Sequence, residues 1–171
     1  LTYEDVTNID SVGIVTARAG VNVSGGQLLV GSGVTIGIAG IATFRSGRID
    51  VGDSLQNTSI GQLAGDAHTT GHGNVAMGRG SLGANTTGYN NTSLGRVALA
   101  VNTTGYESVA VGAYALDANT TGNQNTAMGY AALSANVSGA RNTGLGYGAL
   151  SANTGSYNTS LGYNALATNT T

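Results

Sequence analysis

Cysteine, proline, tryptophan and lysine are absent from this chain of 171 residues, and only 8% of its residues are charged. Without cysteine there is no disulfide, no thiol nucleophile and no cysteine-ligated metal site, and without lysine there is no Schiff-base amine. The six arginines are scattered and the net charge is −2, which argues against binding to nucleic acid or to an anionic membrane surface. We therefore expect no nucleic-acid partner, no membrane partner and no cofactor.

Long apolar runs are missing too. No run approaches the ~20 residues that cross a bilayer, so membrane insertion is not expected. The sequence begins at Leu1 and stops at Thr171 inside a repeat, which predicts a fragment of a longer polypeptide. What the chain has in quantity is small or polar: 29 glycines, 22 threonines and 17 asparagines.

A repeat of 17 residues organises the chain from Asn57 onward. The seven units begin at residues 57, 74, 91, 108, 125, 142 and 158, and the sixth unit is one threonine shorter than the others. The consensus is N-T-(A/S)-(L/I/V/M)-G-Y-x-A-L-x-A-N-T-T-G-x-N, and its positions are called columns 1 to 17 below. We therefore divide the chain into a segment 1–54 and a repeat domain 55–171.

Several columns keep one residue type through the repeat. Column 5 is always glycine, as expected where the backbone bends sharply or passes close to another segment: Gly61, Gly78, Gly95, Gly112, Gly129, Gly146 and Gly162. Column 9 is leucine in six units: Leu82, Leu99, Leu116, Leu133, Leu150 and Leu166. Column 4 is always aliphatic or Met: Ile60, Met77, Leu94, Val111, Met128, Leu145 and Leu161. We expect columns 4 and 9 to be buried inside, and Asn and Thr rows to lie at corners and outside.

The repeat length predicts an all-β fold. Seventeen residues is too short for a helix-turn-helix repeat but suits one coil of a β-solenoid or β-roll, with two or three short strands per coil and coils stacked ~4.8 Å apart. Stacked columns place each residue beside its own copy, so like charges would repel and neutral Asn, Thr, Ala and Gly are favoured. The N-terminal 54 residues alternate in short stretches such as Val12-Gly13-Ile14 and predict a short-stranded, triple-β-helix-like shaft.

One coil has little with which to build a core. A single large aliphatic residue and one Leu per coil bury little apolar area against the ~1–2 kcal/mol of backbone entropy that each ordered residue costs. The small residues of columns 3, 8 and 11 leave room for close approach to identical neighbours. We therefore expect a homotrimer of parallel rods.

Two parts of the sequence resemble known fibrous proteins. Residues 3–21 (YEDVTNIDSVGIVTARAGV) and 40–44 (GIATF) resemble repeated segments of tail fibres and other virion structural proteins of marine bacteriophages, cyanophages especially. The N-T-A-x-G-Y-x-A-L units resemble repeats of phage tail fibres. They are also similar to the β-roll repeats in heads of trimeric autotransporter adhesins of the YadA type, whose S-V-A-(I/V)-G motif is matched by residues 108–112.

The resemblance implies a function. It implies a structural, non-enzymatic protein of the virion tail, extracellular, which attaches to a host receptor of protein or glycan and contacts other tail proteins and two copies of itself. The alternative that it implies is the head of a bacterial adhesin at the cell surface. Two further hypotheses come from other classes: an ice-binding solenoid with rows Thr103-Thr104 and Thr120-Thr121, and a polysaccharide depolymerase.

Few side chains qualify as candidate sites. His68 and His72 could ring a trimer axis and bind a metal, or they could be corner substitutions, since His72 stands where two other units have Tyr89 and Tyr106. Asp66, Glu107 and Asp117 lie in different units, whereas hydrolysis of a polysaccharide needs two carboxyl groups within ~5–10 Å. We expect no catalytic residue. Column 6 ends in three tyrosines that would form either a surface contact or stacked rings between coils: Tyr130, Tyr147 and Tyr163.

Overall fold

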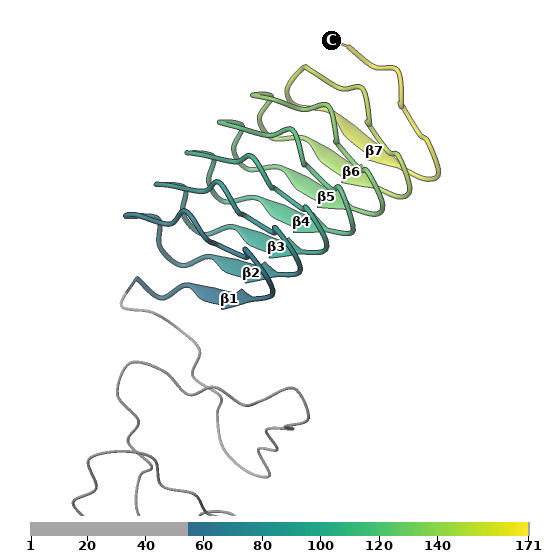
Figure 1. Cartoon of the computed structure of the whole chain (residues 1–171). Coiled ribbons are helices and arrows are strands. Elements are labelled where there is room, and N and C mark those ends of the chain that lie inside the picture. Colours follow the sequence, from purple (N-terminus) through teal and green to yellow (C-terminus); the bar gives the residue numbers. More distant parts are fainter. Residues whose placement is uncertain (1–54, 171) are drawn as a thin grey trace, which may run out of the picture. The chain divides into compact units, whose positions relative to one another are not determined.

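The computed structural model describes residues 55–170, which form a β-solenoid of about six turns (Figure 1). The predicted segment 1–54 lies outside the described residues, as does Thr171. Each repeat unit is one coil, so the unit numbers above become coil numbers 1 to 7. The predicted all-β solenoid with a 17-residue turn is thereby confirmed.

Each coil contributes one strand of three residues to a single 7-stranded sheet in sequential order, β1 to β7. All neighbouring strands are parallel and in register, so Thr58 pairs with Val75 and Ile60 pairs with Met77, one unit away. The strands are β1 Thr58–Ile60, β2 Val75–Met77, β3 Thr92–Leu94, β4 Val109–Val111, β5 Thr126–Met128, β6 Thr143–Leu145 and β7 Thr159–Leu161.

The expectation of two or three strands per coil is wrong among residues 55–170, because the rest of each coil is made of turns. Residues in columns 5, 7, 9 and 17 have positive φ, which interrupts extended backbone. Hydrogen bonds between coils nevertheless continue around these turns: Gly78 N donates to Ile60 O at 2.8 Å, and Leu82 N donates to Ala98 O at 3.1 Å. Each coil is therefore held to the next along most of its length.

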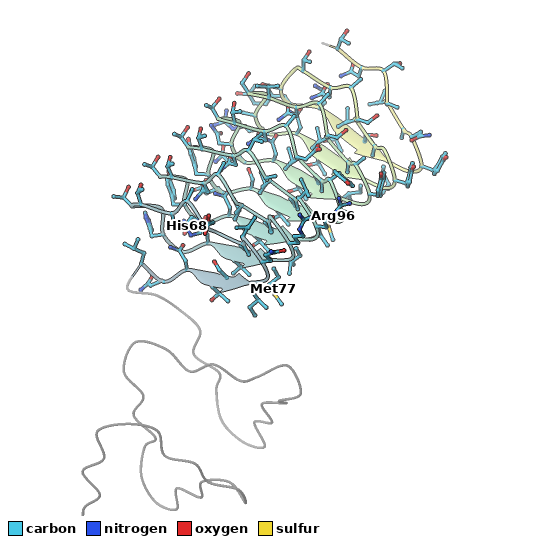
Figure 2. The ribbon with its side chains drawn as sticks, in the orientation of Figure 1. His68, Met77 and Arg96 are labelled. Carbon is cyan, nitrogen blue, oxygen red and sulfur yellow. The ribbon has the colours of Figure 1, made fainter. Side chains whose placement is uncertain are left out.

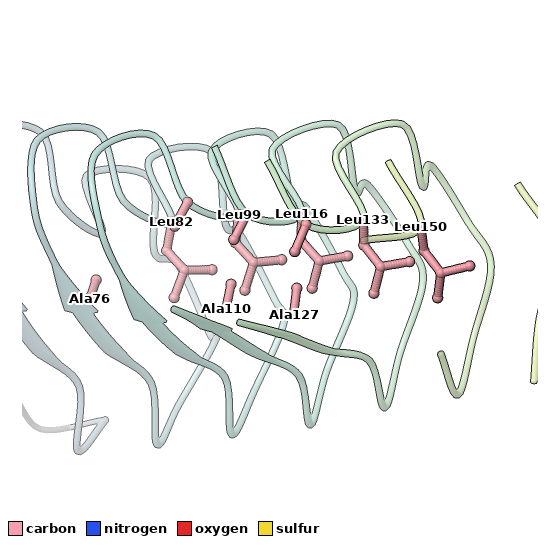
Figure 3. Close-up of a cluster of buried hydrophobic side chains, with 11 residues drawn as sticks. Ala76, Leu82, Leu99, Ala110, Leu116, Ala127, Leu133 and Leu150 are labelled. Carbon is pink, nitrogen blue, oxygen red and sulfur yellow. The ribbon is translucent and has the colours of Figure 1, made fainter. Parts of the chain in front are cut away.

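The core of the solenoid is a row of leucines from column 9 beside small residues of columns 3 and 8. The leucines of coils 2 to 6 are fully buried, with Ala76, Ala110 and Ala127 of column 3 close to them (Figure 3). Leu166 of the last coil is half exposed, and Gly65 stands at this column in the first. Columns 3 and 8 thus fill the inside of one chain rather than the contact between chains that we expected.

These leucines have an unusual backbone. Their φ values lie between 48° and 54° in coils 2 to 6, the left-handed region that costs a residue with a Cβ about 1–2 kcal/mol. In this conformation the side chain enters the core while the amide still reaches the next coil, as where Leu99 N donates to Ala115 O at 3.0 Å. Burial of a leucine side chain, worth about 1.5–3 kcal/mol, offsets the strain.

The expectation that column 4 is buried inside the coil is wrong. Ile60, Met77 and Met128 are 47%, 38% and 45% exposed, and Met77 lies at the outer side of the sheet in Figure 2. Leu94, Val111 and Leu145 are partly buried, but no column-4 residue belongs to the buried core. The reason is the period of two in a strand: when column 3 points inward, columns 2 and 4 must point outward. A three-residue strand therefore buries only its middle residue.

Two asparagine columns that we expected outside are buried instead. In column 12, Asn119 Nδ2 donates to Asn102 Oδ1 of the preceding coil at 2.8 Å and to Gly122 O at 3.0 Å. In column 1, Asn91 donates in the same way to Asn74 Oδ1 and to a glycine carbonyl. A primary amide both donates and accepts, so it can bond to a copy of itself one coil away and leave no buried polar atom unpaired.

We predict that Gly112→Ala destabilises the solenoid by about 3 kcal/mol or more. A Cβ at Gly112, where φ is 131°, would lie 2.5 Å from the carbonyl oxygen of Gly129, a backbone atom that cannot move aside without breaking the coil contact. Gly80→Ala is the matched control, because its φ is also positive but a Cβ there meets nothing within 4 Å. Its effect should stay at about 1–2 kcal/mol, the cost of the left-handed backbone alone. Chemical denaturation compares the two, and equal destabilisation would contradict the close-approach argument.

Candidate functional site

The outer surface of residues 55–170 is built from rows of equivalent side chains. Among these residues no group of three or more His, Asp or Glu side chains is placed to hold a metal ion. None of them forms a helix long and apolar enough to cross a membrane. The candidate functional features are therefore the exposed rows themselves.

The first row is the apolar stripe, which we define as the seven column-4 residues from Ile60 to Leu161. Their strands are in register, so the stripe runs across the whole sheet for about 29 Å at ~4.8 Å per strand. Column 2, which is Thr or Val in every coil, lies on the same face and is partly buried in coils 1 to 6. The result is a sheet face with one aliphatic or Met side chain and one Thr or Val side chain per coil, each partly buried or exposed within residues 55–170.

The second row is the tyrosine stack, defined as Tyr130, Tyr147 and Tyr163. Neighbouring ring centroids are 5.1 and 5.2 Å apart and the planes differ by 14° and 17°. Tyr114 extends the row edge-on to Tyr130 at 5.6 Å, and the guanidinium of Arg96 lies 5.1 Å above the Tyr114 ring. The stacked rings cover one another's faces, so the stack offers edges and hydroxyl groups to the outside. That geometry favours ring stacking between coils over a platform for sugar rings.

A second aromatic row, which the sequence argument did not single out, occupies column 16. His72 stacks on Tyr89 at 5.3 Å and Tyr89 on Tyr106 at 4.8 Å, each pair within 5° of parallel. The signal was available, since these three residues share one column. His68 belongs to column 12, the column of the buried asparagines, so the two histidines lie in different rows.

Column 17 adds a polar row beside it. Gln124 Nε2 donates to Glu107 Oε2 at 3.0 Å, and Arg141 Nε donates to Gln124 Oε1 at 2.9 Å. Arg141 also lies over the ring of Tyr157, at 5.4 Å from its centroid. Opposite charges are thus two coils apart with a neutral amide between them, an arrangement that keeps like charges from stacking.

The threonine rows proposed for ice binding differ from each other. Thr86, Thr103 and Thr120 use their hydroxyl groups to donate to a backbone carbonyl of the next coil, at 3.0 to 3.2 Å. These three residues are partly buried, whereas Thr87, Thr104 and Thr121 of the adjacent column are exposed. The hydroxyl groups of one row are thus used in hydrogen bonds that hold the turns together. This favours a structural role at the corner of the coil over ice binding.

No protein-family model, no curated protein and no solved structure matches the chain.

Asp117 is the ionisable group whose surroundings are most unusual. Its Oδ1 is buried without a hydrogen-bond partner among the described residues. Burial raises the pKa of this carboxyl above its ordinary value, and hydrogen bonds from the backbone N–H groups of Asp117 and Ala118 offset only part of the rise. The neighbouring coil has Ser134 in the same column, so a carboxylate is not required by the coil.

We predict that Asp117→Ser is more stable than the wild-type protein at neutral pH. A raised pKa means that the folded state holds the proton more tightly than the unfolded state, so wild-type stability falls as the pH rises through the pKa of this carboxyl. The advantage of the variant should therefore be largest at pH 7 and shrink toward pH 3. Melting temperatures across this range measure it. Asp66→Ser, which removes an exposed carboxylate from the same column, controls for net charge, and a pH-independent gain in Asp117→Ser would contradict the argument.

Proposed function

We propose that this chain is a structural, non-enzymatic segment of a bacteriophage tail fibre, in which three parallel copies form a rod that carries or constitutes a host-attachment surface. The observation that carries the proposal is the apolar stripe, a straight row along a solenoid whose seven strands are in register. The resemblance of residues 3–21 and 40–44 to virion structural segments of marine phages favours a phage fibre over other fibrous proteins.

The stripe supports self-association for a physical reason. Large contiguous apolar patches on soluble proteins mark interaction sites, and the exposed side chains of the stripe would gain about 25 cal/mol per Å² on burial: Ile60, Met77, Met128 and Leu161. A second copy fits this stripe, because its own stripe repeats an apolar side chain at the same strand spacing. Three rods around one axis would cover each stripe with two others and close the assembly.

The rod would act as a rigid spacer and as a multivalent attachment element. Coil-to-coil hydrogen bonds and the buried asparagine rows support a stiff shaft, which would hold a tip away from the virion. Three copies in one fibre would raise the effective concentration at the host surface beyond that of a single weak contact. The partners would be the other two copies, further tail proteins and a host receptor of protein or glycan.

A non-enzymatic role is supported by the placement of the carboxylates. Among residues 55–170, Asp66, Glu107 and Asp117 lie in coils 1, 3 and 4, and Glu107 accepts a hydrogen bond from Gln124. A head domain of a bacterial trimeric adhesin is the second candidate, because Ser108 and Gly112 flank β4 (Val109–Val111) in the pattern S-V-A-V-G.

We predict that Met128→Lys dissociates the trimer. Met128 lies in the apolar stripe, and burying its replacement charge at an interface should cost about 2 kcal/mol or more per chain. Thr121→Lys adds the same charge at an exposed corner and should leave assembly unchanged. Sedimentation at micromolar concentration is the measurement. A folded monomeric wild-type protein, or a trimer indifferent to Met128→Lys, would refute the role of the stripe.

The virion assignment is tested by location. An antiserum raised against the chain should decorate tail fibres in electron micrographs of virions from the source of the gene. Labelling of the bacterial surface, together with a four-strand membrane anchor at the end of the complete gene, would favour the adhesin head instead.

A further inference from the structure

The tyrosine stack holds three phenol side chains in a fixed and accessible row. The backbone carbonyl of Tyr130 accepts a hydrogen bond from Gly148 N at 2.9 Å, and the backbone carbonyl of Tyr147 accepts one from Asn164 N at 2.8 Å. Neighbouring coils therefore fix the spacing of the backbone beneath the rings. The rings are 47%, 49% and 76% exposed from Tyr130 to Tyr163. Their separation of 5.1 and 5.2 Å is thus a property of the coil.

This arrangement suits a reaction specific to phenols. One-electron oxidation removes an electron and a proton from each of two tyrosines, and the resulting phenoxyl radicals combine through the ring carbons next to the hydroxyl groups. One carbon–carbon bond forms, and a hydrogen moves from each coupled carbon to oxygen, which restores both phenols. The two electrons and two protons that are released reduce one hydrogen peroxide to two waters.

We propose that the tyrosine stack is a site of oxidative cross-linking, in which Tyr147 couples to Tyr130 or to Tyr163 and joins adjacent coils of one chain covalently. The oxidant is hydrogen peroxide, used through a one-electron peroxidase. The chain has no cysteine for a disulfide and no lysine for an isopeptide bond, so exposed tyrosines offer it a different covalent link.

Proximity is the argument for selectivity. Two radicals on neighbouring coils are already within about one ring diameter of each other, whereas coupling between separate molecules needs a diffusive encounter. The exposed edges leave each ring free to tilt about its side-chain bonds until the two carbons meet. Tyr157 provides the contrast, because it is 71% exposed but lies with Arg141 outside the stack.

The test treats the full chain with a peroxidase and limiting peroxide at micromolar concentration, and follows the blue fluorescence of dityrosine. Cleavage after Arg96 and Arg141 separates Tyr130 from Tyr147, so their coupling joins the peptides 97–141 and 142–171 with the loss of two hydrogens. Coupling of Tyr147 to Tyr163 leaves peptide 142–171 two hydrogens lighter. Fragmentation of both products locates the bonds.

Tyr147→Phe is the decisive variant, because it keeps a ring in the stack but removes the central phenol. The yield of coupled products that contain peptide 142–171 within single chains should fall roughly tenfold or more in this variant. Tyr89 and Tyr106 also stack, at 4.8 Å, but their coupling would join peptides 80–96 and 97–141 and is counted separately. Tyr157→Phe is the matched control and should leave the yield unchanged. A denaturing gel separates products within one chain from products between chains.

Three results would overturn the proposal: equal yields in wild type and Tyr147→Phe, a yield that follows Tyr157, or products found only between chains. Melting of Tyr147→Phe before oxidation checks that its coils remain folded. Coupling within one chain needs no second copy, so failure here leaves the proposed trimeric fibre untouched, and failure of the trimer leaves this site untouched.

Discussion

The in-register hydrogen bonding of each coil to the next is the constraint on which the whole solenoid depends. It places every side chain beside the equivalent side chain of the neighbouring coils, at the strand spacing of ~4.8 Å. Leucine packs on leucine, an amide donates to an amide, and a phenol ring stacks on a phenol ring. A charged side chain is instead repelled by a copy of itself. Among residues 55–170, Arg79 and Arg96 are the one pair of like charges in the same column of adjacent coils, and both are exposed.

The same constraint explains how so thin a rod has an interior. A leucine in each of coils 2 to 6 supplies the apolar part, while the asparagines of columns 1 and 12 fill the rest with hydrogen bonds that run along the axis. Ser108 interrupts one row: its Oγ still accepts from Asn125 N at 3.2 Å, but it lacks the amide donor that Asn91 has at this column. The missing side-chain hydrogen bond is tolerated because the backbone hydrogen bonds to both neighbouring coils remain.

The sequence predicted the period, the parallel stacking and the turn glycines, because these depend only on which residue types recur at a fixed interval. It did not predict which side of the strand faces inward. Columns 3 and 4 are both uncharged, and alternation is equally satisfied by an interior of Ala76 and Ala110 or by one of Met77 and Val111. The choice is made by Leu82 and its equivalents, whose positive φ turns them toward column 3. Leucine has no intrinsic preference for the left-handed region, so the sequence could not predict that these leucines adopt it or which strand face they pack against.

The division between inside and outside has a consequence for function. Columns 8, 9 and 12 each keep one residue type in all but one coil, whereas column 6 passes from Gln62 and two arginines through Ala113 to the tyrosine stack. An outer position such as column 6 can therefore change without disturbing the hydrogen bonds beneath it, whereas the outer columns 2 and 4 keep one class of side chain throughout. A rod built in this way separates the residues that make it stiff from the residues that meet a partner. That separation lets the outer surface differ along the rod while the interior stays the same.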